Sequence, residues 1–280
     1  MRSNRLLIAI VIAAIGAGYY YCNQQVNPVT GEKQHVALTP DQEVALGLQT
    51  APQMVEQLGG LHPDPEVQAT VEQLGESIVA ASAARGSRYQ YDFHVLADPE
   101  TVNAFALPGG QVFVTNGLIR KLSDEAQLAG VLGHEIGHVV GRHSAEQLAK
   151  SQLTQALVGA AGVAASSDDS SGQQAAAIAA AVGQLVNMRF GRKDELEADR
   201  FGVRFMSESG YDPHALSEVM RILAESSGGS RQPEFLSTHP DPGNREGEIN
   251  AEIGRLYPGG VPAQLGRGDS RRFSALKSRL

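Results

Sequence analysis

Two histidines four residues apart, with a glutamate directly after the first, stand in the stretch GVLGHEIGHVVGRHS (residues 130–144). A helix advances by about 100° per residue, so His134 and His138 are about 40° apart and can reach one ion from the same face. Glu135 is turned far enough to avoid that ion, yet it is close enough to hold a water beside it. This pattern favours a metal ion that activates water, with Glu135 accepting the proton.

This stretch does not complete a metal site by itself. In a continuous helix His143 points about 140° away from His138, so we do not expect it to be a ligand. We expect Arg142 and His143 at the solvent-exposed end of the helix, where cations oppose the helix dipole. Taken alone, the five-letter pattern is also compatible with a surface helix that carries two ordinary histidines.

The missing ligand is offered by GRKDELEADRFG (residues 191–202). Glu195 and Asp199 are four residues apart and share a helix face, whereas Glu197 points to the opposite side. We predict Glu195 as the third ligand, and Asp199 as the acceptor of a hydrogen bond from the far nitrogen of a ligand histidine. Taken alone, this segment is an ordinary acidic helix face. Paired with residues 134–138, it predicts an open catalytic site, since a structural zinc has four protein ligands.

Four glycines form a stripe beside the histidine face: Gly130, Gly133, Gly137 and Gly141. Each costs a helix interior about 1 kcal/mol relative to alanine. The stripe therefore predicts that another backbone approaches this helix very closely.

The elements that position these residues are mostly helical. Apolar residues recur at helical spacing over residues 44–58 and 67–79, which predicts two helices. Residues 89–97 alternate as a half-buried strand does, and residues 101–119 contain two short strands joined by a turn at Pro108–Gly110. We expect an α+β fold, mainly helical, with a small sheet before the histidine helix.

Further helices follow this sheet. Ser123, with Asp124 and Glu125 behind it, is a suitable cap for the histidine helix. A second helix is expected to about Ala165, then a surface loop over 166–174 and a helix over 175–204.

Composition excludes some functions. The formal net charge is −8, and Lys and Arg are scattered except for Arg271–Arg272, so a nucleic-acid partner is not expected. Cys22 is the one cysteine, so no intrachain disulfide can form.

The N-terminus has the features of an export segment. Arg2 and Arg5 precede an uncharged stretch over residues 6–21, which predicts a membrane anchor with the rest of the chain outside the cytoplasm. A cleaved signal segment and a lipid-modified Cys22 are the alternatives.

The motifs together resemble a known family. HEIGH, followed about sixty residues later by ELEAD, is similar to the gluzincin zinc metallopeptidases with HExxH and ExxxD motifs. This family includes membrane heat-shock, mitochondrial Oma-type and CAAX prenyl proteases, and the chain looks closest to exported single-anchor bacterial members. NPVTGEK, NAFALPGGQVFVTNGL and STHPDPGNR also resemble family segments, so that the likeness covers residues 25–250.

This resemblance implies a zincin-like metallopeptidase domain whose edge strand flanks the active-site helix. One Zn²⁺ would be bound by His134, His138 and Glu195, and Glu135 would be the general base. The expected substrate strand is Asn103, Ala104 and Phe105, which pairs main chain to main chain. Arg245 is expected to stabilise the oxyanion. His239 is expected to occupy the open metal position as an inhibitory latch, or else to form an ordinary capped turn.

The sequence therefore predicts a zinc metalloendopeptidase that acts on misfolded or misassembled envelope proteins, facing the periplasm. The expected organisation is an anchor or signal over 1–22, a linker over 23–40, the peptidase domain over 41–250 and a loosely ordered tail over 251–280. The alternatives are a mostly latched chaperone for unfolded envelope proteins and a purely structural zinc domain.

Overall fold

The computed structural model describes residues 2–165, 190–226, 234–239 and 244–280. The loop expected at 166–174, and the first part of the helix expected over 175–204, lie outside the described residues. The helices before the site are α1 (Arg2–Cys22), α2 (Pro40–Gln57), α3 (Pro65–Ala81), the short η1 (Ala83–Gly86) and α4 (Asn116–Lys121). The later ones are α5 (Glu125–Val140), α6 (His143–Ala165), α8 (Arg192–Glu208), α9 (His214–Ser226), α10 (Phe235–Thr238), α11 (Arg245–Leu256) and α12 (Ser270–Arg279).

The described strands form two small sheets. β1 (Gln24–Val26) and β2 (Lys33–His35) make an antiparallel hairpin. The other sheet has the order β3-β5-β4, with β3 (Asp92–Leu96) parallel to β5 (Gln111–Thr115) and β4 (Ala104–Ala106) antiparallel to it. The predicted α+β, mainly helical fold and the predicted strands before the histidine helix are confirmed.

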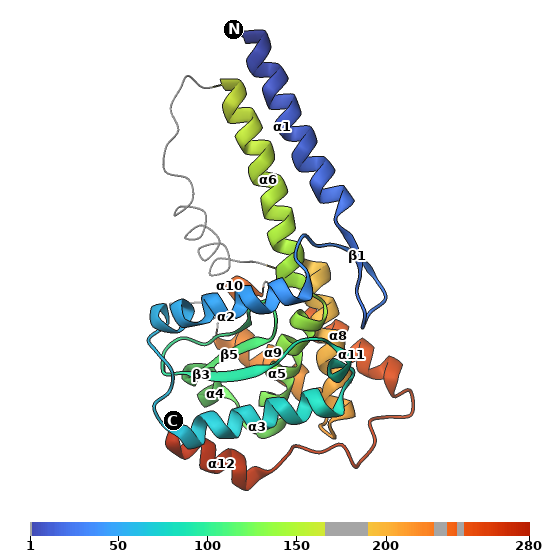
Figure 1. Cartoon of the computed structure of the whole chain (residues 1–280). Helices are drawn as coiled ribbons and strands as arrows, with labels where there is room; N and C mark the ends of the chain where they lie inside the picture. The colour runs from blue at the N-terminus through green and yellow to red at the C-terminus, as the bar shows by residue number, and fades with distance from the viewer. Residues whose placement is uncertain (1, 166–189, 227–233, 240–243) are drawn as a thin grey trace.

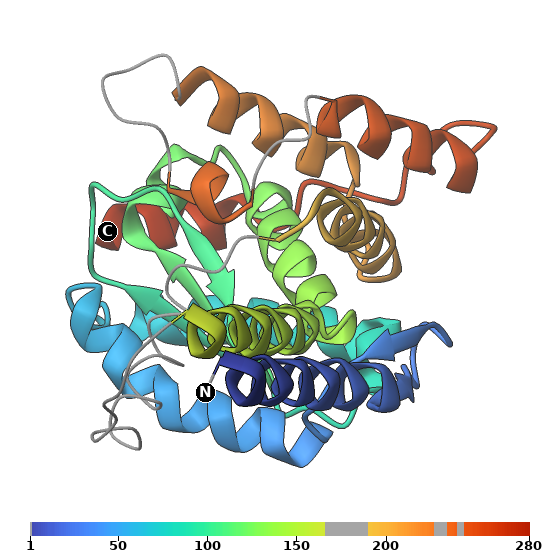
Figure 2. The same ribbon diagram turned by 90° about the horizontal axis from the view of Figure 1, so that it is seen from above.

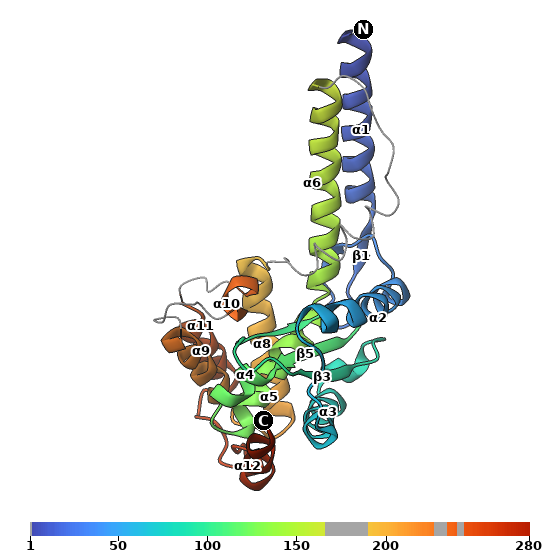
Figure 3. The same cartoon turned by 90° about the vertical axis from the view of Figure 1, so that its left-hand side faces the viewer.

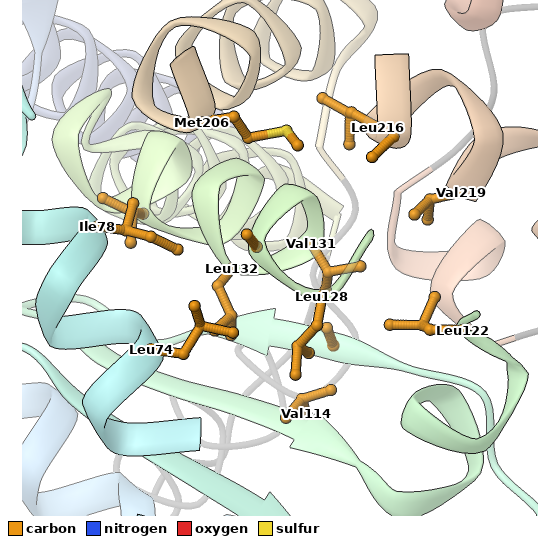
Figure 4. Close-up of a cluster of buried hydrophobic side chains, with 14 of the residues drawn as sticks. Leu74, Ile78, Val114, Leu122, Leu128, Val131, Leu132, Met206, Leu216 and Val219 are labelled. Carbon is orange, nitrogen blue, oxygen red and sulfur yellow. The ribbon is translucent and has the colours of Figure 1, made fainter. Parts of the chain in front are cut away.

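Helix α5 lies at the centre of the molecule. All of its residues are buried, including His134, Glu135 and His138. Figure 4 shows Leu128 and Leu132 pointing toward Val114 of β5 and Leu74 of α3, while Met206 of α8 lies on the other side of the helix. Figure 3 shows the same layering, with the sheet and α3 on one side of α5, and α8, α9 and α11 on the other. The helix that carries the HExxH pattern is thus held on all faces.

The cap of α5 differs from the prediction by one residue. Asp124, and not Ser123, is the N-cap, and its carboxylate accepts a hydrogen bond from the Gln127 backbone N–H at 3.0 Å. Ser123 instead donates its own N–H to the Gln127 side chain at 2.7 Å. Asp124 thus satisfies a free amide of the first turn, one residue later than predicted.

Helices α1 and α6 extend away from the rest of the chain side by side (Figures 1 and 2). Gly16 of α1 faces Ala156 of α6, where an added Cβ would come within 2.7 Å of the alanine Cβ. Within the described residues, no helix combines the length and the apolar character that crossing a membrane requires. The anchor expected over residues 6–21 stays a prediction.

The C-terminal segment corrects the expectation of a loosely ordered tail over 251–280. Helix α11 continues to Leu256, and α12 packs against α3 with Phe273 and Leu276 buried. Arg272 of α12 also donates hydrogen bonds to the buried Glu125 carboxylate at the start of α5. The sequence was misleading because glycine, proline and basic residues surround a helix whose apolar face consists of two residues three apart.

Candidate metal centre

Helices α5 and α8 bring two distant parts of the chain together around a buried group of metal-ligating side chains. His134, His138, Glu195 and His239 each offer one ligand atom, and these atoms all lie within 4.8 Å of one another. The Nε2 atoms of His134 and His138 are 3.1 Å apart, and the Glu195 carboxylate oxygens lie 3.6 and 3.5 Å from them. All four side chains are buried.

The glycine stripe permits this close approach. An added Cβ at Gly137 would lie 3.0 Å from the Ala198 carbonyl oxygen of α8, and one at Gly133 would lie 3.4 Å from Gly202 Cα. Gly130 faces Leu216 of α9. The expectation that another backbone approaches this face holds for these three glycines. Gly141 differs, because its neighbour is the His143 ring.

The donor set and its unsatisfied atoms fit a metal ion with a bound water. Both carboxylate oxygens of Glu135 and Nε2 of His239 are buried without a hydrogen-bond partner among the described residues. Buried polar groups normally have partners, so this concentration in one place calls for an absent group. Imidazole nitrogens with a carboxylate oxygen suit zinc and similar divalent transition metals.

The electrostatics favour the metal-binding form of two expected ligands, His138 and Glu195. Burial, together with the positive charge of neighbouring groups, lowers the pKa of His138 well below its ordinary value, so its ring is neutral. Burial alone would raise the pKa of Glu195, but His239 and Arg245 outweigh it, and the pKa is lowered. Burial raises the pKa of Glu135, as suits a group that accepts and then releases a proton.

Asp199 lies where the sequence placed it, on the far side of a ligand histidine. Its Oδ1 is 2.9 Å from His134 Nδ1, so it can accept the Nδ1–H and leave Nε2 free for a metal. Burial would raise the pKa of Asp199, but Arg245 and His134 outweigh it, and the carboxylate is held ionised.

Arg245 is engaged with both carboxylates of α8. Its Nε and Nη2 donate to Asp199 at 2.9 and 2.7 Å, and its Nη1 lies 3.0 Å from Glu195 Oε2. This arrangement orients the two acids. The expected contact with an oxyanion stays a prediction.

His239 lies within the ligand group itself. Its Nδ1 is 3.1 Å from Glu195 Oε1, its Nε2 is 3.6 Å from Glu135 Oε1, and Phe235 stacks on the ring with centroids 4.4 Å apart. Burial would lower the pKa of His239, but the carboxylates of Glu195 and Glu135 outweigh it and raise the pKa. His239 is also the C-cap of α10, where its backbone N–H donates to the Phe235 carbonyl at 2.7 Å. The inhibitory latch stays a prediction.

The expectation that Arg142 and His143 lie at a solvent-exposed helix end was wrong, since both side chains are buried. Helix α5 ends at Val140, and Arg142 has a φ of 56°, so the chain turns and α6 starts at His143. The projection along one continuous helix therefore fails. Arg142 donates to the buried Glu43 carboxylate at 2.9 Å, an interaction that the sequence did not suggest.

The predicted substrate strand lies at the edge of the sheet beside the metal centre. Asn103 precedes β4, and Ala104 and Phe105 belong to it. A pocket lies between this strand and His239, and it is lined mainly by apolar side chains: Met54, Leu58, Phe105, Ala106, Leu107 and Phe190. Phe190 also stacks on His138 with centroids 4.0 Å apart, and no sequence pattern pointed to it.

Comparison with known proteins shows the family of this chain. The chain is 32% identical over 267 residues to the beta-barrel assembly-enhancing protease of Escherichia coli (strain K12), covering 90% of this chain and 53% of that protein. It is also 32% identical over 235 residues to the mitochondrial metalloendopeptidase OMA1 of Schizosaccharomyces pombe, covering 82% of this chain and 66% of that protein. The chain thus spans about half to two thirds of these relatives. Residues 65–253 match peptidase family M48, to which the chain therefore belongs.

Proposed function

We propose that the chain is a zinc-dependent metalloendopeptidase. The main support is the buried group formed by two histidines of α5 and Glu195 of α8. Next to it lies the Glu135 carboxylate, which accepts no hydrogen bond from the described residues. Bound zinc would act there as a Lewis acid toward the scissile carbonyl and its attacking water. Glu135 takes the proton from that water and passes it to the leaving amine, a role that its raised pKa suits.

The test of this mechanism is Glu135→Gln, with unfolded casein as substrate. Cleavage is expected to fall at least about a hundredfold, since general acid–base catalysis typically contributes a factor of 10²–10⁴. Bound zinc should be unchanged because Glu135 is not a ligand. Glu76→Gln, the same change at an exposed position of α3, is the matched control. Full casein-cleaving activity of the Glu135→Gln variant would refute the proposed role of Glu135.

We propose further that substrates bind as an added strand along β4. Within the β4–β5 pair, Asn103 O and Leu107 N bond to β5, so by alternation the main-chain groups of Ala104 and Ala106 point away from it. Ala106→Pro removes one outward N–H without removing a bond to β5. It is expected to raise KM for casein while zinc affinity stays the same. An unchanged KM would contradict binding at this edge.

Misfolded or misassembled envelope proteins are the proposed substrates, and the envelope is the proposed location. The name of the Escherichia coli relative, a beta-barrel assembly-enhancing protease, and the charge and hydropathy pattern of residues 1–22 support this. A comparison of the envelope proteins that accumulate in cells making only the Glu135→Gln form would identify substrates. No accumulation relative to wild type would argue against this assignment.

The contacts of His239 favour a second candidate function, a chaperone whose protease is latched most of the time. His239 Nδ1 lies 3.4 Å from His134 Nε2 and takes part in the ligand group. If His239 holds the enzyme inactive, His239→Ala raises casein cleavage, and Glu135→Gln still binds unfolded substrate. A fall in cleavage would instead make His239 part of the catalytic machinery.

A further inference from the structure

The ring of His138 has polar neighbours on both of its nitrogens. Its Nε2 faces His134 and Glu195, whereas its Nδ1 lies 2.9 Å from Nδ1 of His143. The other nitrogen of His143, Nε2, lies 3.4 Å from Oε2 of Glu197. Glu197, which the helix projection placed away from the site, thus approaches it through His143.

The hydrogens along this row have one consistent arrangement. If Nε2 of His138 binds a cation, its hydrogen must be on Nδ1, which then donates to His143 Nδ1. His143 must accept there, so its own hydrogen is on Nε2 and points at the Glu197 carboxylate. We propose that His143, backed by Glu197, is a positioning residue that holds His138 in its metal-binding tautomer and orientation, a role that rests on the proposed metal site.

The pairing of each ligand histidine with its own partner supports this assignment. His134 is held by Asp199, whose Oδ1 is 2.9 Å from its Nδ1. Among the described residues, the group that holds Nδ1 of His138 is the His143 ring and not a carboxylate. Such partners of metal-bound histidines typically contribute a factor of 10–100 to metal affinity.

The local backbone is built to place the His143 ring. A Cβ at residue 141 would lie 2.7 Å from His143 Cε1, so only glycine leaves the ring enough room. The left-handed conformation of Arg142 then turns the chain, and Gln25, Leu38 and Glu43 hold its guanidinium. His143 is 1% exposed, so its nitrogens depend on these protein partners and not on solvent.

The experiment measures zinc affinity of the metal-free full chain by competition with a chelator. His143→Leu removes the acceptor and is expected to weaken zinc binding 10–100-fold. His143→Asn offers its Oδ1 at the place of Nδ1 and is expected to stay within a few-fold of wild type. His214→Leu, the same change at an exposed histidine of α9, should bind zinc as wild type does.

A second pair of variants keeps the test decisive if His143→Leu does not fold. Gly141→Ala retains the imidazole but displaces it, and should also weaken zinc binding. Gly254→Ala in α11, where an added Cβ meets nothing within 4 Å, is the control. Thermal melts of the metal-free variants separate lost affinity from lost structure.

The proposal would be overturned if His143→Leu or Gly141→Ala bound zinc as tightly as wild type does. It would also be overturned if His143→Asn bound zinc as weakly as His143→Leu, because the hydrogen-bond acceptor at residue 143 would then make no difference. Failure of the proposed function has a different signature. In that case wild-type protein binds zinc but cleaves no peptide, while the ranking of the variants in zinc affinity is unchanged.

Discussion

Gly137→Ala is the most direct test of how closely α5 and α8 must approach. The new methyl group would lie 2.9 Å from Phe201 Cβ, 3.0 Å from the Ala198 carbonyl oxygen and 3.1 Å from Ala198 Cα. Backbone atoms cannot rotate away, so α8 must shift, and such overpacking costs about 1–3 kcal/mol. The gain in helix propensity is about 1 kcal/mol. The net result is expected to be a loss of up to about 2 kcal/mol.

Gly133→Ala provides a matched control on the same helix. Its added methyl would meet Gly202 at 3.4–3.5 Å, an ordinary contact, so this variant should be stabilised by up to about 1 kcal/mol. The helix-propensity gain cancels between the two variants, which leaves an expected difference of about 1–3 kcal/mol from overpacking alone.

Urea unfolding of the metal-free variants measures this difference, and chelator competition measures zinc affinity on the same samples. Glu195 lies on α8 one turn before Ala198, so Gly137→Ala should also weaken zinc binding, whereas Gly133→Ala should leave it nearly unchanged. Equal stability and equal zinc affinity of the two variants would refute the view that helix separation sets the metal site.

Other predictions concern elements farther from the metal. Phe273→Ala should destabilise the chain by about 3–5 kcal/mol in urea unfolding, because this side chain of α12 is buried; an effect below about 1 kcal/mol would mean that α12 is not docked. Arg142→Ala should cost about 3–5 kcal/mol, since it removes the positive charge that is paired with the buried Glu43 carboxylate and leaves that carboxylate with the Tyr89 hydroxyl; calorimetry checks this, and a smaller loss in the Arg142→Ala, Glu43→Gln double variant is expected. The pKa of Asp199 is lowered in the folded state, so its stabilising contribution is present above the unfolded pKa of about 3.9 and is lost as the pH falls below it. The stability gap between metal-free wild type and Asp199→Asn should therefore narrow below about pH 4, and a gap independent of pH would contradict this reasoning.

Local periodicity accounts for much of what could be predicted. Helical and strand spacing located α2, α3, β3 and the β4–β5 pair, because each has a face that must be buried. The same spacing placed His134 and His138 on one face and selected Glu195 over Glu197, since these relations depend only on the 3.6-residue turn. The free-energy cost of four glycines in one helix likewise indicated that another backbone lies close to it.

Relations that cross a break in the helix could not be predicted in this way. His143 was projected along a helix that ends three residues earlier, and its burial depends on the Arg142 turn and on contacts with the N-terminal segment. Phe190 reaches His138 from a residue that no periodic pattern includes. The docking of α12 depends on a surface that α3 and the start of α5 supply from far away in the chain.

The sequence by itself determined which side chains can share a helix face, because helix geometry is local and repeats along the chain. The tertiary structure decided how closely those faces approach, that Arg245 pairs with Glu195 and Asp199, and that His143 lies behind His138. Those outcomes depend on packing between segments about a hundred residues apart in several cases, and no local repeat encodes such distances.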